Sequence, residues 1–121
     1  MKIIIDTNGF MVPIQFGVDI FEELNRLGFN EFCVPEAVIF EIERLMKREK
    51  GTDRTAAKVA RSMMNRCERI VATGHADDVI LRLAKNMGAA VLTNDIKLKR
   101  RLANYGIQTV SLRQKNKLDI V

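Results

Sequence analysis

The sequence predicts an α/β domain with a mainly parallel sheet, and three observations support this prediction. Short apolar runs typical of buried strands alternate with longer stretches in which apolar residues recur at helical spacing. Three of the predicted helices end at a glycine, the residue that most readily adopts the left-handed helix C-cap. No repeat, low-complexity tract or linker divides the 121 residues, so we expect a single domain over residues 1–121.

The predicted elements follow one another along the chain. Strands are expected over Lys2–Ile5, Glu31–Val34, Arg69–Ala72, Ala90–Leu92 and Gln108–Ser111. Helices are expected over Val12–Leu27, Glu36–Glu49, Arg54–Arg66, Asp77–Met87 and Ile96–Tyr105. Because strands alternate with helices, each strand should lie parallel to its neighbours in the sheet.

Specific residues set the helix boundaries. The first helix has Pro13 near its start and Gly28 directly after its end. The second carries its apolar residues on one stripe, which predicts one face packed on the core. The segment Gly51-Thr52-Asp53 separates the second helix from the third, and Gly88 and Gly106 close the last two.

Composition excludes several classes of protein. The chain is 47% hydrophobic and 29% charged, which is ordinary for a globular domain. No apolar run approaches the roughly 20 residues of a membrane span, and the N-terminus does not resemble a signal peptide, so a cytoplasmic protein with no membrane partner is expected. Two cysteines and one histidine are too few for a zinc site, and reduced thiols are expected. Neither a P-loop nor a dinucleotide-binding glycine motif occurs, and the pattern of paired acids of a receiver-type signalling domain is absent.

The charge balance favours a polyanionic partner. The net charge is +5, from 20 lysines and arginines against 15 acids. The basic residues cluster in three segments, around residues 47–61, 97–101 and 113–117. Each cluster alone could equally be the solvated face of a helix.

Two aspartates lie just after predicted strands. Asp6 comes after the apolar run Ile3–Ile5, and Asp95 closes the segment after Ala90–Leu92. The carboxyl ends of parallel strands meet at one edge of a sheet, where the crevices of such folds lie. Asp95 also precedes a predicted helix, so it is equally suited to be an N-cap. The two roles are compatible because helix N-termini lie at the same edge.

Helical periodicity distinguishes two neighbouring acids on one predicted helix but not two acids on another. Asp77 lies on the inward face of its predicted helix, whereas Asp78 is turned about 100° further and points away. Asp77 is therefore preferred and Asp78 is the second choice. Glu41 and Glu43 border opposite sides of the apolar stripe of their helix, and periodicity does not choose between them.

Carboxylates gathered at one crevice repel one another unless a cation binds or their pKa values rise. A site made of oxygen ligands selects hard ions such as Mg²⁺ or Mn²⁺. Such an ion can activate water for attack on a phosphodiester, and the surrounding basic residues would hold a nucleic acid strand. This hypothesis joins the acids and the basic surface in one function.

The chain resembles the PIN-domain family over its whole length. The resemblance rests on four motifs in the family's order and spacing. They are Ile5-Asp6-Thr7-Asn8, Val34-Pro35 leading through Val38 to Glu41, Ala76-Asp77-Asp78-Val79-Ile80, and Leu92-Thr93-Asn94-Asp95. The fold that the resemblance implies is a three-layer α/β/α sandwich with a five-stranded parallel sheet of order 3-2-1-4-5.

The resemblance also implies an activity and a site. The activity is that of an Mg²⁺- or Mn²⁺-dependent endoribonuclease that hydrolyses single-stranded RNA and leaves a 5′-phosphate and a 3′-hydroxyl. It favours Glu41 over Glu43 as the fourth catalytic acid beside Asp6, Asp77 and Asp95. The expected supporting residues around the metal are Thr7, Asn8, Asp78, Thr93 and Asn94.

Biological role and partners stay open at this point. Family members include ribosomal RNA processing enzymes and toxins of toxin–antitoxin pairs, so an antitoxin or a ribosome-assembly partner is expected, and structured RNA is a further substrate. A PIN-like module that binds RNA or protein without cleaving is the alternative. A homodimer is also expected, with the apolar face of the helix at Arg54–Arg66 as its contact.

Three cations and the aromatic residues complete the predictions. Lys97, Arg100 and Arg113 are the candidates for contacts with RNA phosphates. The six phenylalanines are expected in the core and not as base-stacking groups, and Tyr105 is the one aromatic side chain considered for stacking.

Overall fold

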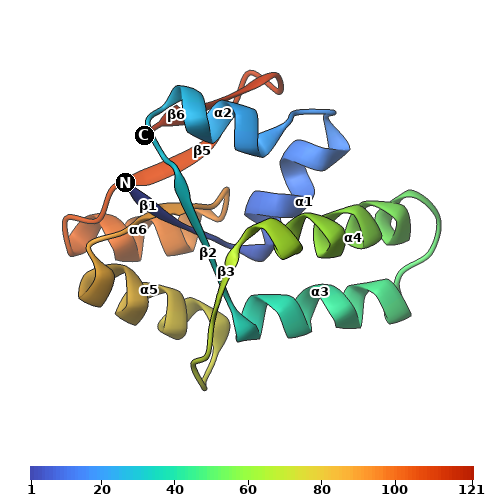
Figure 1. Cartoon of the computed structure of the whole chain (residues 1–121), viewed down its shortest axis with the longest axis horizontal. Helices are drawn as coiled ribbons and strands as arrows, with labels where there is room; N and C mark the ends of the chain where they lie inside the picture. The colour runs from blue at the N-terminus through green and yellow to red at the C-terminus, as the bar shows by residue number, and fades with distance from the viewer.

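The computed structural model describes residues 1–121, which fold as three layers with a sheet between helices (Figure 1). The sheet has six strands in the order β3-β2-β1-β4-β5-β6. The strands are β1 (Lys2–Ile5), β2 (Glu31–Pro35), β3 (Glu68–Ile70), β4 (Ala90–Leu92), β5 (Thr109–Arg113) and β6 (Lys117–Ile120). The first five are parallel, which confirms the predicted order, and β6 is an additional antiparallel strand.

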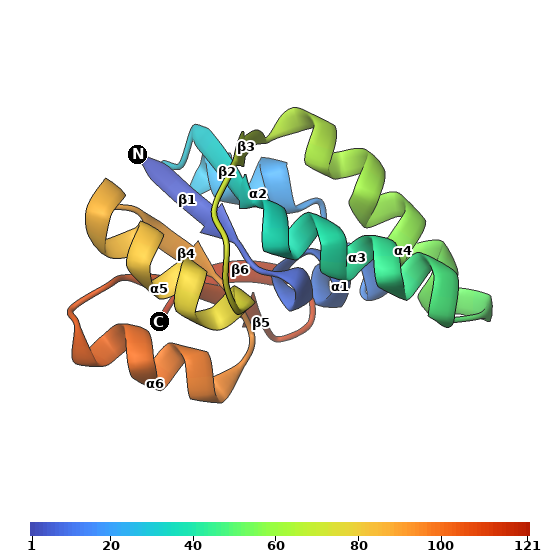
Figure 2. The ribbon, with the colours of Figure 1, turned by 90° about the horizontal axis from the view of Figure 1, so that it is seen from below.

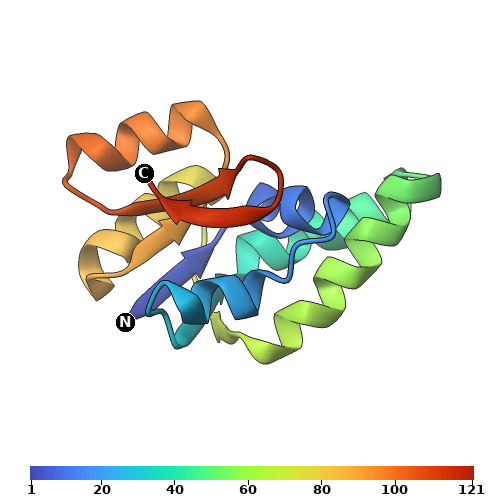
Figure 3. The same ribbon diagram turned by 90° about the horizontal axis from the view of Figure 1, so that it is seen from above.

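Six α-helices and one short 3₁₀ helix connect the strands. They are α1 (Thr7–Gln15), α2 (Ile20–Arg26), α3 (Glu36–Arg48), α4 (Gly51–Met63), η1 (Met64–Arg66), α5 (Ala76–Met87) and α6 (Ile96–Asn104). Helices α5 and α6 cover one face of the sheet, and α1 and α2 lie on the other (Figures 2 and 3). Helices α3 and α4 lie side by side and extend beyond the sheet (Figures 1 and 2). No helix has both the length and the apolar character that crossing a membrane requires.

The central strand β1 anchors the core. Ile3, Ile4 and Ile5 have no exposed surface, because a parallel strand covered by helices on both faces buries consecutive side chains. Phe10 of α1 and Phe21 of α2 pack in the same cluster. The core therefore holds the end of β1, and with it the following residue, in a fixed position.

The predicted helix over Val12–Leu27 is wrong, because this segment forms two helices. Gly17 adopts a φ of 70° after α1, a backbone conformation that ends a helix and favours glycine. Asp19 then caps α2 by accepting hydrogen bonds from the amides of Phe21 and Glu22. Helix α1 also begins earlier than predicted, at Thr7.

The hairpin formed by β5 and β6 was not predicted. Gln114 and Lys115 in its turn have φ values of 56° and 62°, where glycine or asparagine is usual. The residue types therefore carried no turn signal. The free edge of β6 is covered from α2, since Leu118 donates its amide to Glu23 and accepts a hydrogen bond from Arg26 at its carbonyl.

The α4 helix, expected to supply an apolar face to a dimer, has Val59 43% exposed but packs its alanines inside the chain. Ala56, Ala57 and Ala60 are buried, and α4 packs against α3 and α1 of the same chain. Both cysteines are free, as expected, and Cys33 is buried. Burial raises the pKa of the Cys67 thiol to about 12, which leaves it protonated and unreactive at neutral pH.

Candidate active site

The four acids singled out by the sequence lie around one cavity, where β1 and β4 end and α1, α5 and α6 begin. The cavity has a volume of about 380 Å³, and its acidic lining residues are Asp6, Glu41, Glu49, Asp53, Asp77 and Asp95. No lysine, arginine or histidine lines it. The cavity is therefore strongly negative, which makes it suited to a cation and unsuited to a free phosphate group.

Asp6 is the buried residue of this group. It directly follows β1, caps α1 and is only 5% exposed. Its Oδ1 accepts a hydrogen bond from the Thr7 amide at 2.7 Å, and its Oδ2 accepts one from the Thr93 hydroxyl at 2.9 Å. Burial raises the pKa of Asp6 to about 6, and the negative charges of Asp77 and Glu41 add to the rise. The charges of two of the other acids therefore act on the Asp6 carboxylate.

The segment after β4 is tied to the start of α1 by side-chain hydrogen bonds. The Asn8 Oδ1 accepts a hydrogen bond from the Asn94 amide at 2.7 Å and lies 3.2 Å from the Thr93 hydroxyl, whose single proton is donated to Asp6. The Thr93 hydroxyl also accepts a hydrogen bond from the Asp95 amide at 3.1 Å. Thr93, Asn8 and Asn94 therefore hold the two loops that carry Asp6 and Asp95 in a fixed relation.

Asp95 caps a helix with one carboxylate oxygen, and its other carboxylate oxygen is free. Its Oδ1 accepts hydrogen bonds from the amides of Lys97 and Leu98, at 2.8 and 3.3 Å, and so caps α6. Its Oδ2 has no hydrogen-bond partner, and the residue lines the cavity. Both roles foreseen for Asp95 are compatible in this geometry.

The two neighbouring aspartates of α5 point to different surroundings. Asp77 lines the cavity. Asp78 is exposed and forms an ion pair with Arg101 of α6 at 2.8 Å, which lowers the pKa of Asp78. The structure thus places Asp78 outside the cavity, so it does not have the supporting position around a metal that was expected for it.

The two candidate glutamates of α3 are separated in the same way. Glu41 lines the cavity, whereas Glu43 forms an ion pair with Arg61 of α4 at 3.2 Å. Helix α3 is amphipathic and buries Val38, Ile39 and Ile42, so residues on its two borders face different neighbours. The packing of α4 against α3 places Arg61 beside Glu43, so Glu43 is held in an ion pair.

Two acids at the rim of the cavity were not predicted from the sequence. Glu49 lies eight residues after Glu41, with Leu45 between them, and all three line the cavity. This i, i+4, i+8 spacing on one helix face was a usable signal. Asp53 comes from the start of α4 and lies 3.4 Å from the side-chain amide of Gln15; only the packing of α4 against α1 places it here.

The donor set fits a hard divalent cation, although the side chains do not converge as a ready-made centre. The residues that line the cavity offer carboxylate oxygens, and the hydroxyl of the lining residue Thr7 is a buried oxygen with no hydrogen-bond partner. Burial, with a smaller contribution from the charges of Asp77 and Glu41, raises the pKa of Asp6, and a bound cation would offset both effects. No three acidic, histidine or cysteine side chains lie close enough together to hold a metal ion as they stand. Metal binding therefore requires side-chain movement around a fixed Asp6.

The predicted phosphate-binding cations lie outside the cavity. Lys97 and Arg100 are exposed on α6, and neither forms an ion pair within the chain. Arg113 ends β5 at the same sheet edge and pairs with Asp119 at 3.2 Å. Lys97 is the nearest of the three in sequence to an acid of the site, two residues from Asp95.

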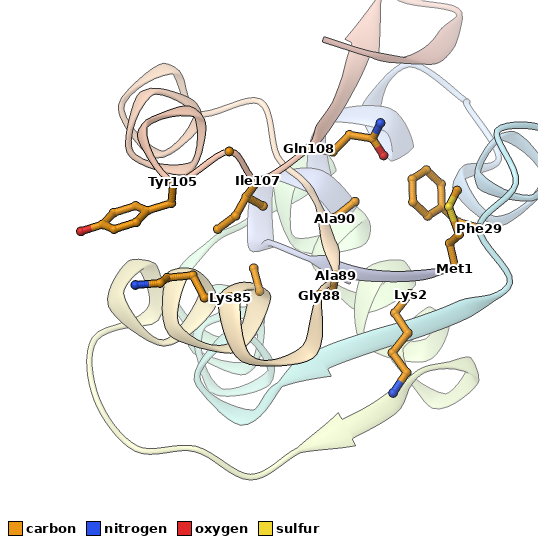
Figure 4. Close-up of a pocket in the computed structure, with 12 residues that line it drawn as sticks. Met1, Lys2, Phe29, Lys85, Gly88, Ala89, Ala90, Tyr105, Ile107 and Gln108 are labelled. Atoms are coloured by element: carbon orange, nitrogen blue, oxygen red, sulfur yellow. The ribbon is translucent and has the colours of Figure 1, made fainter.

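A second cavity of about 530 Å³ lies at the opposite edge of the sheet, near the amino ends of β1 and β4 (Figure 4). It is lined by Lys2, Lys85 and Tyr105 but by no acidic residue. The Lys85 ammonium lies 4.3 Å from the Tyr105 ring centroid. Tyr105, considered for stacking on a nucleic acid, is thus far from the acidic cavity.

The fold and the acidic cavity together define a class of protein, a PIN-type α/β domain. The family model described as "PIN like domain" matches residues 3–115. The chain belongs to this family.

Individual relatives agree with this assignment. The chain is 31% identical over 125 residues to ribonuclease VapC4 of Methanocaldococcus jannaschii, covering 98% of this chain and 95% of the relative. It is 27% identical over 111 residues to ribonuclease VapC9 of Archaeoglobus fulgidus, covering 92% and 82%. Among solved structures, the PIN domain endonuclease Utp24 superposes with a TM-score of 0.81 at 29% identity, covering 98% of this chain and 90% of that one. A domain of a functionally unknown M. jannaschii protein shares the fold, with a TM-score of 0.59 at 22% identity over 93% and 91%.

Proposed function

We propose that this chain is a divalent-metal-dependent endoribonuclease that hydrolyses phosphodiester bonds of single-stranded RNA. The observation that carries the proposal is the position of Asp6, Glu41, Asp77 and Asp95 around one cavity at the carboxyl edge of the sheet. The names of the relatives support it, since two are ribonucleases and one is an endonuclease.

Each acid has a role in this proposal. Asp6 is the fixed ligand, because its backbone amide bonds to Leu92 and its carboxylate to Thr7 and Thr93. Asp77, Asp95 and Glu41 complete the ligand set for Mg²⁺ or Mn²⁺. When bound, the ion lowers the pKa of water and stabilises charge on the phosphate.

The protein supplies orientation around that ion. Thr93 and Asn8 keep the loops of Asp6 and Asp95 in register through their hydrogen bonds. Since no cation of the protein lines the cavity, the phosphate backbone on either side of the cleaved bond must be held by residues outside it, among which we propose Lys97, Arg100 and Arg113.

The paired aspartates of α5 provide the sharpest test. Asp77→Asn should lower the cleavage of a labelled single-stranded RNA by at least about 100-fold in Mn²⁺, the usual cost of losing an essential catalytic group. Asp78→Asn makes the same chemical change one residue away, and it should retain cleavage within a fewfold. Equal activity of the two variants, or activity that persists in EDTA, would contradict the proposal.

The non-catalytic alternative has its own outcome in the same experiment. If wild-type protein binds the RNA in Mn²⁺ but does not cut it, the domain is a binding module. We also propose that the enzyme acts in ribosomal RNA processing. This role predicts that cleavage is confined to precursor ribosomal RNA. Growth arrest on expression, relieved by Asp77→Asn and by a co-expressed antitoxin, would assign the enzyme to the toxins.

A further inference from the structure

A third cavity, of about 580 Å³, borders the acidic cavity and shares Glu41 and Asp77 with it. It is formed by α3 on one side and by the β3–α5 connection on the other. Phe40, Arg44 and His75 contribute its largest other side chains. Any chain bound across Glu41 and Asp77 would enter this cavity on leaving the acidic one.

Phe40 is the exposed aromatic residue of this cavity. The prediction that all six phenylalanines lie in the core is wrong for Phe40 and for Phe16, which are 46% and 47% exposed. Phe40 directly precedes Glu41 on α3. The Arg69 guanidinium lies 5.8 Å from the centroid of its ring and is held by Glu36 through hydrogen bonds of 2.6 and 2.9 Å. The ring is supported from the protein side and remains open to solvent.

The charges of the two cavities differ. The acidic cavity contains no basic side chain, whereas this one contains Arg44, one helical turn beyond Phe40. Its acids are Glu41 and Asp77, shared with the acidic cavity, and Glu36, which is paired with Arg69. Arg44 is exposed and forms no hydrogen bond or ion pair within the chain. An aromatic face beside an unpaired cation is the combination with which proteins hold single-stranded nucleic acids, since the base stacks and the cation meets the phosphate.

We propose that this cavity is a nucleotide subsite, in which Phe40 stacks on the unpaired base next to the cleaved phosphate and Arg44 contacts the following phosphate. The proposal rests on the proposed ribonuclease function and adds a physical reason for its preference for single strands. In a duplex the bases are paired and stacked on one another, so no base face is available to the ring. Every base has such a face, so the subsite accepts any base.

The absence of tryptophan from the chain allows a direct test. Phe40→Trp introduces a single indole at the proposed stacking position. Phe16→Trp is a matched control, because Phe16 is equally exposed and also has a cation near its ring, Lys115 at 5.6 Å. Both variants are made in the Asp6→Asn background with Mg²⁺, so that RNA binds without being cut.

The titration uses an unstructured single-stranded RNA of about eight nucleotides, within the range that small single-strand sites cover. We expect the emission at position 40 to be quenched in step with binding, and the emission at position 16 to stay unchanged. A blunt RNA duplex of the same length should leave both unchanged. If RNA binds, measured by anisotropy of a label, and position 40 does not respond or responds no more than position 16, the subsite proposal is overturned.

A kinetic comparison separates this proposal from the proposed function. Phe40→Ala should weaken single-strand binding roughly 5- to 150-fold, the range found for loss of one stacked base, and raise KM more than it lowers kcat. Phe40→Trp should restore binding, and Phe16→Ala should leave it unchanged. A Phe40→Ala variant with wild-type KM would overturn the subsite while leaving the nuclease proposal intact. A wild-type protein that does not cut RNA would refute the nuclease but not the titration, which requires no turnover.

Discussion

Replacing Asp6 by asparagine should remove the activity and at the same time stabilise the protein at neutral pH. Asp6 is 5% exposed, and burial together with Asp77 and Glu41 raises its pKa to about 6. Without a metal ion, the folded protein must therefore keep a buried carboxylate charged at neutral pH. Asparagine has nearly the same shape and carries no charge.

The expected gain follows from the pKa of Asp6. A rise from 3.8 to about 6 corresponds to about 3 kcal/mol of folding free energy at neutral pH. The substitution can keep the local hydrogen bonds. The new carbonyl oxygen accepts from the Thr7 amide, and the new NH₂ group donates to the Thr93 hydroxyl, which then donates to Asn8. Allowing for imperfect geometry, we expect Asp6→Asn to raise the free energy of unfolding by about 1–3 kcal/mol.

The gain in the free energy of unfolding must increase as the pH rises. Because the folded-state pKa lies above the unfolded-state value, the folded protein binds more protons than the unfolded chain between about pH 4 and pH 6. Wild-type stability from this group is thus greatest at or below pH 4, and it is lost as the pH rises through 6. The advantage of Asp6→Asn should be small near pH 4 and complete above about pH 7.

The assay is urea unfolding in EDTA, followed by far-ultraviolet circular dichroism at about pH 4.5 and pH 8. The exposed Asp78→Asn is the matched control, and it should lose slightly at pH 8 because its pair with Arg101 is removed. Mg²⁺ should stabilise the wild type and narrow the difference, since a ligand bound only by the folded state adds to its stability. An Asp6→Asn protein that is no more stable than wild type at pH 8, or equally favoured at both pH values, would refute the reasoning.

Three further predictions concern the scaffold of the site. Gly9→Ala should destabilise the protein by about 1–3 kcal/mol or prevent folding, because a Cβ at Gly9 would lie 2.5 Å from the Leu92 carbonyl oxygen of β4. Thermal melting measures the loss of stability, and an unchanged melting temperature would contradict the prediction. Asn8→Ala should cost about 1–3 kcal/mol, because it removes the acceptor of the hydrogen bond from the Asn94 amide in the loop after β4. It should also lower RNA cleavage, and full activity would show that the loop is held by other contacts. Glu23→Ala should speed amide hydrogen exchange at Leu118 by about tenfold or less, the effect of losing roughly 1 kcal/mol at the edge of β6; unchanged exchange would mean that α2 does not protect this edge.

The positions of the five parallel strands and the residues at their ends were predicted from the sequence pattern, whereas the order of the strands was implied by the resemblance to the PIN-domain family. Strands such as Lys2–Ile5 and Ala90–Leu92 were placed correctly, because a strand buried on both faces shows as an uninterrupted apolar run. The position of Asp6 and Asp95 at the carboxyl edge follows from where those runs end. Local patterns were sufficient here because burial of the neighbouring residues decides the structure.

Local patterns failed where a turn depended on few residues. The break at Gly17 and the cap at Asp19 were outweighed by the apolar residues on both sides, and one long helix was predicted instead of α1 and α2. The β5–β6 hairpin turns through Gln114 and Lys115 at positive φ, which residue type does not signal. In this hairpin, the pairing of Leu112 with Leu118 stabilises a turn that the turn residues themselves do not favour.

By itself the sequence determined an α/β domain with acids at the ends of its strands, and periodicity alone placed Asp77 inward and Asp78 outward. Tertiary structure decided which surroundings each side chain meets. Packing of α4 on α3 gives Glu43 an arginine and leaves Glu41 at the cavity, and packing around β1 raises the pKa of Asp6. The same packing leaves Phe40 open to solvent. The physical reason is that burial and electrostatic environment depend on neighbours far apart in the chain, whereas helical and strand periodicity depends on residues close together.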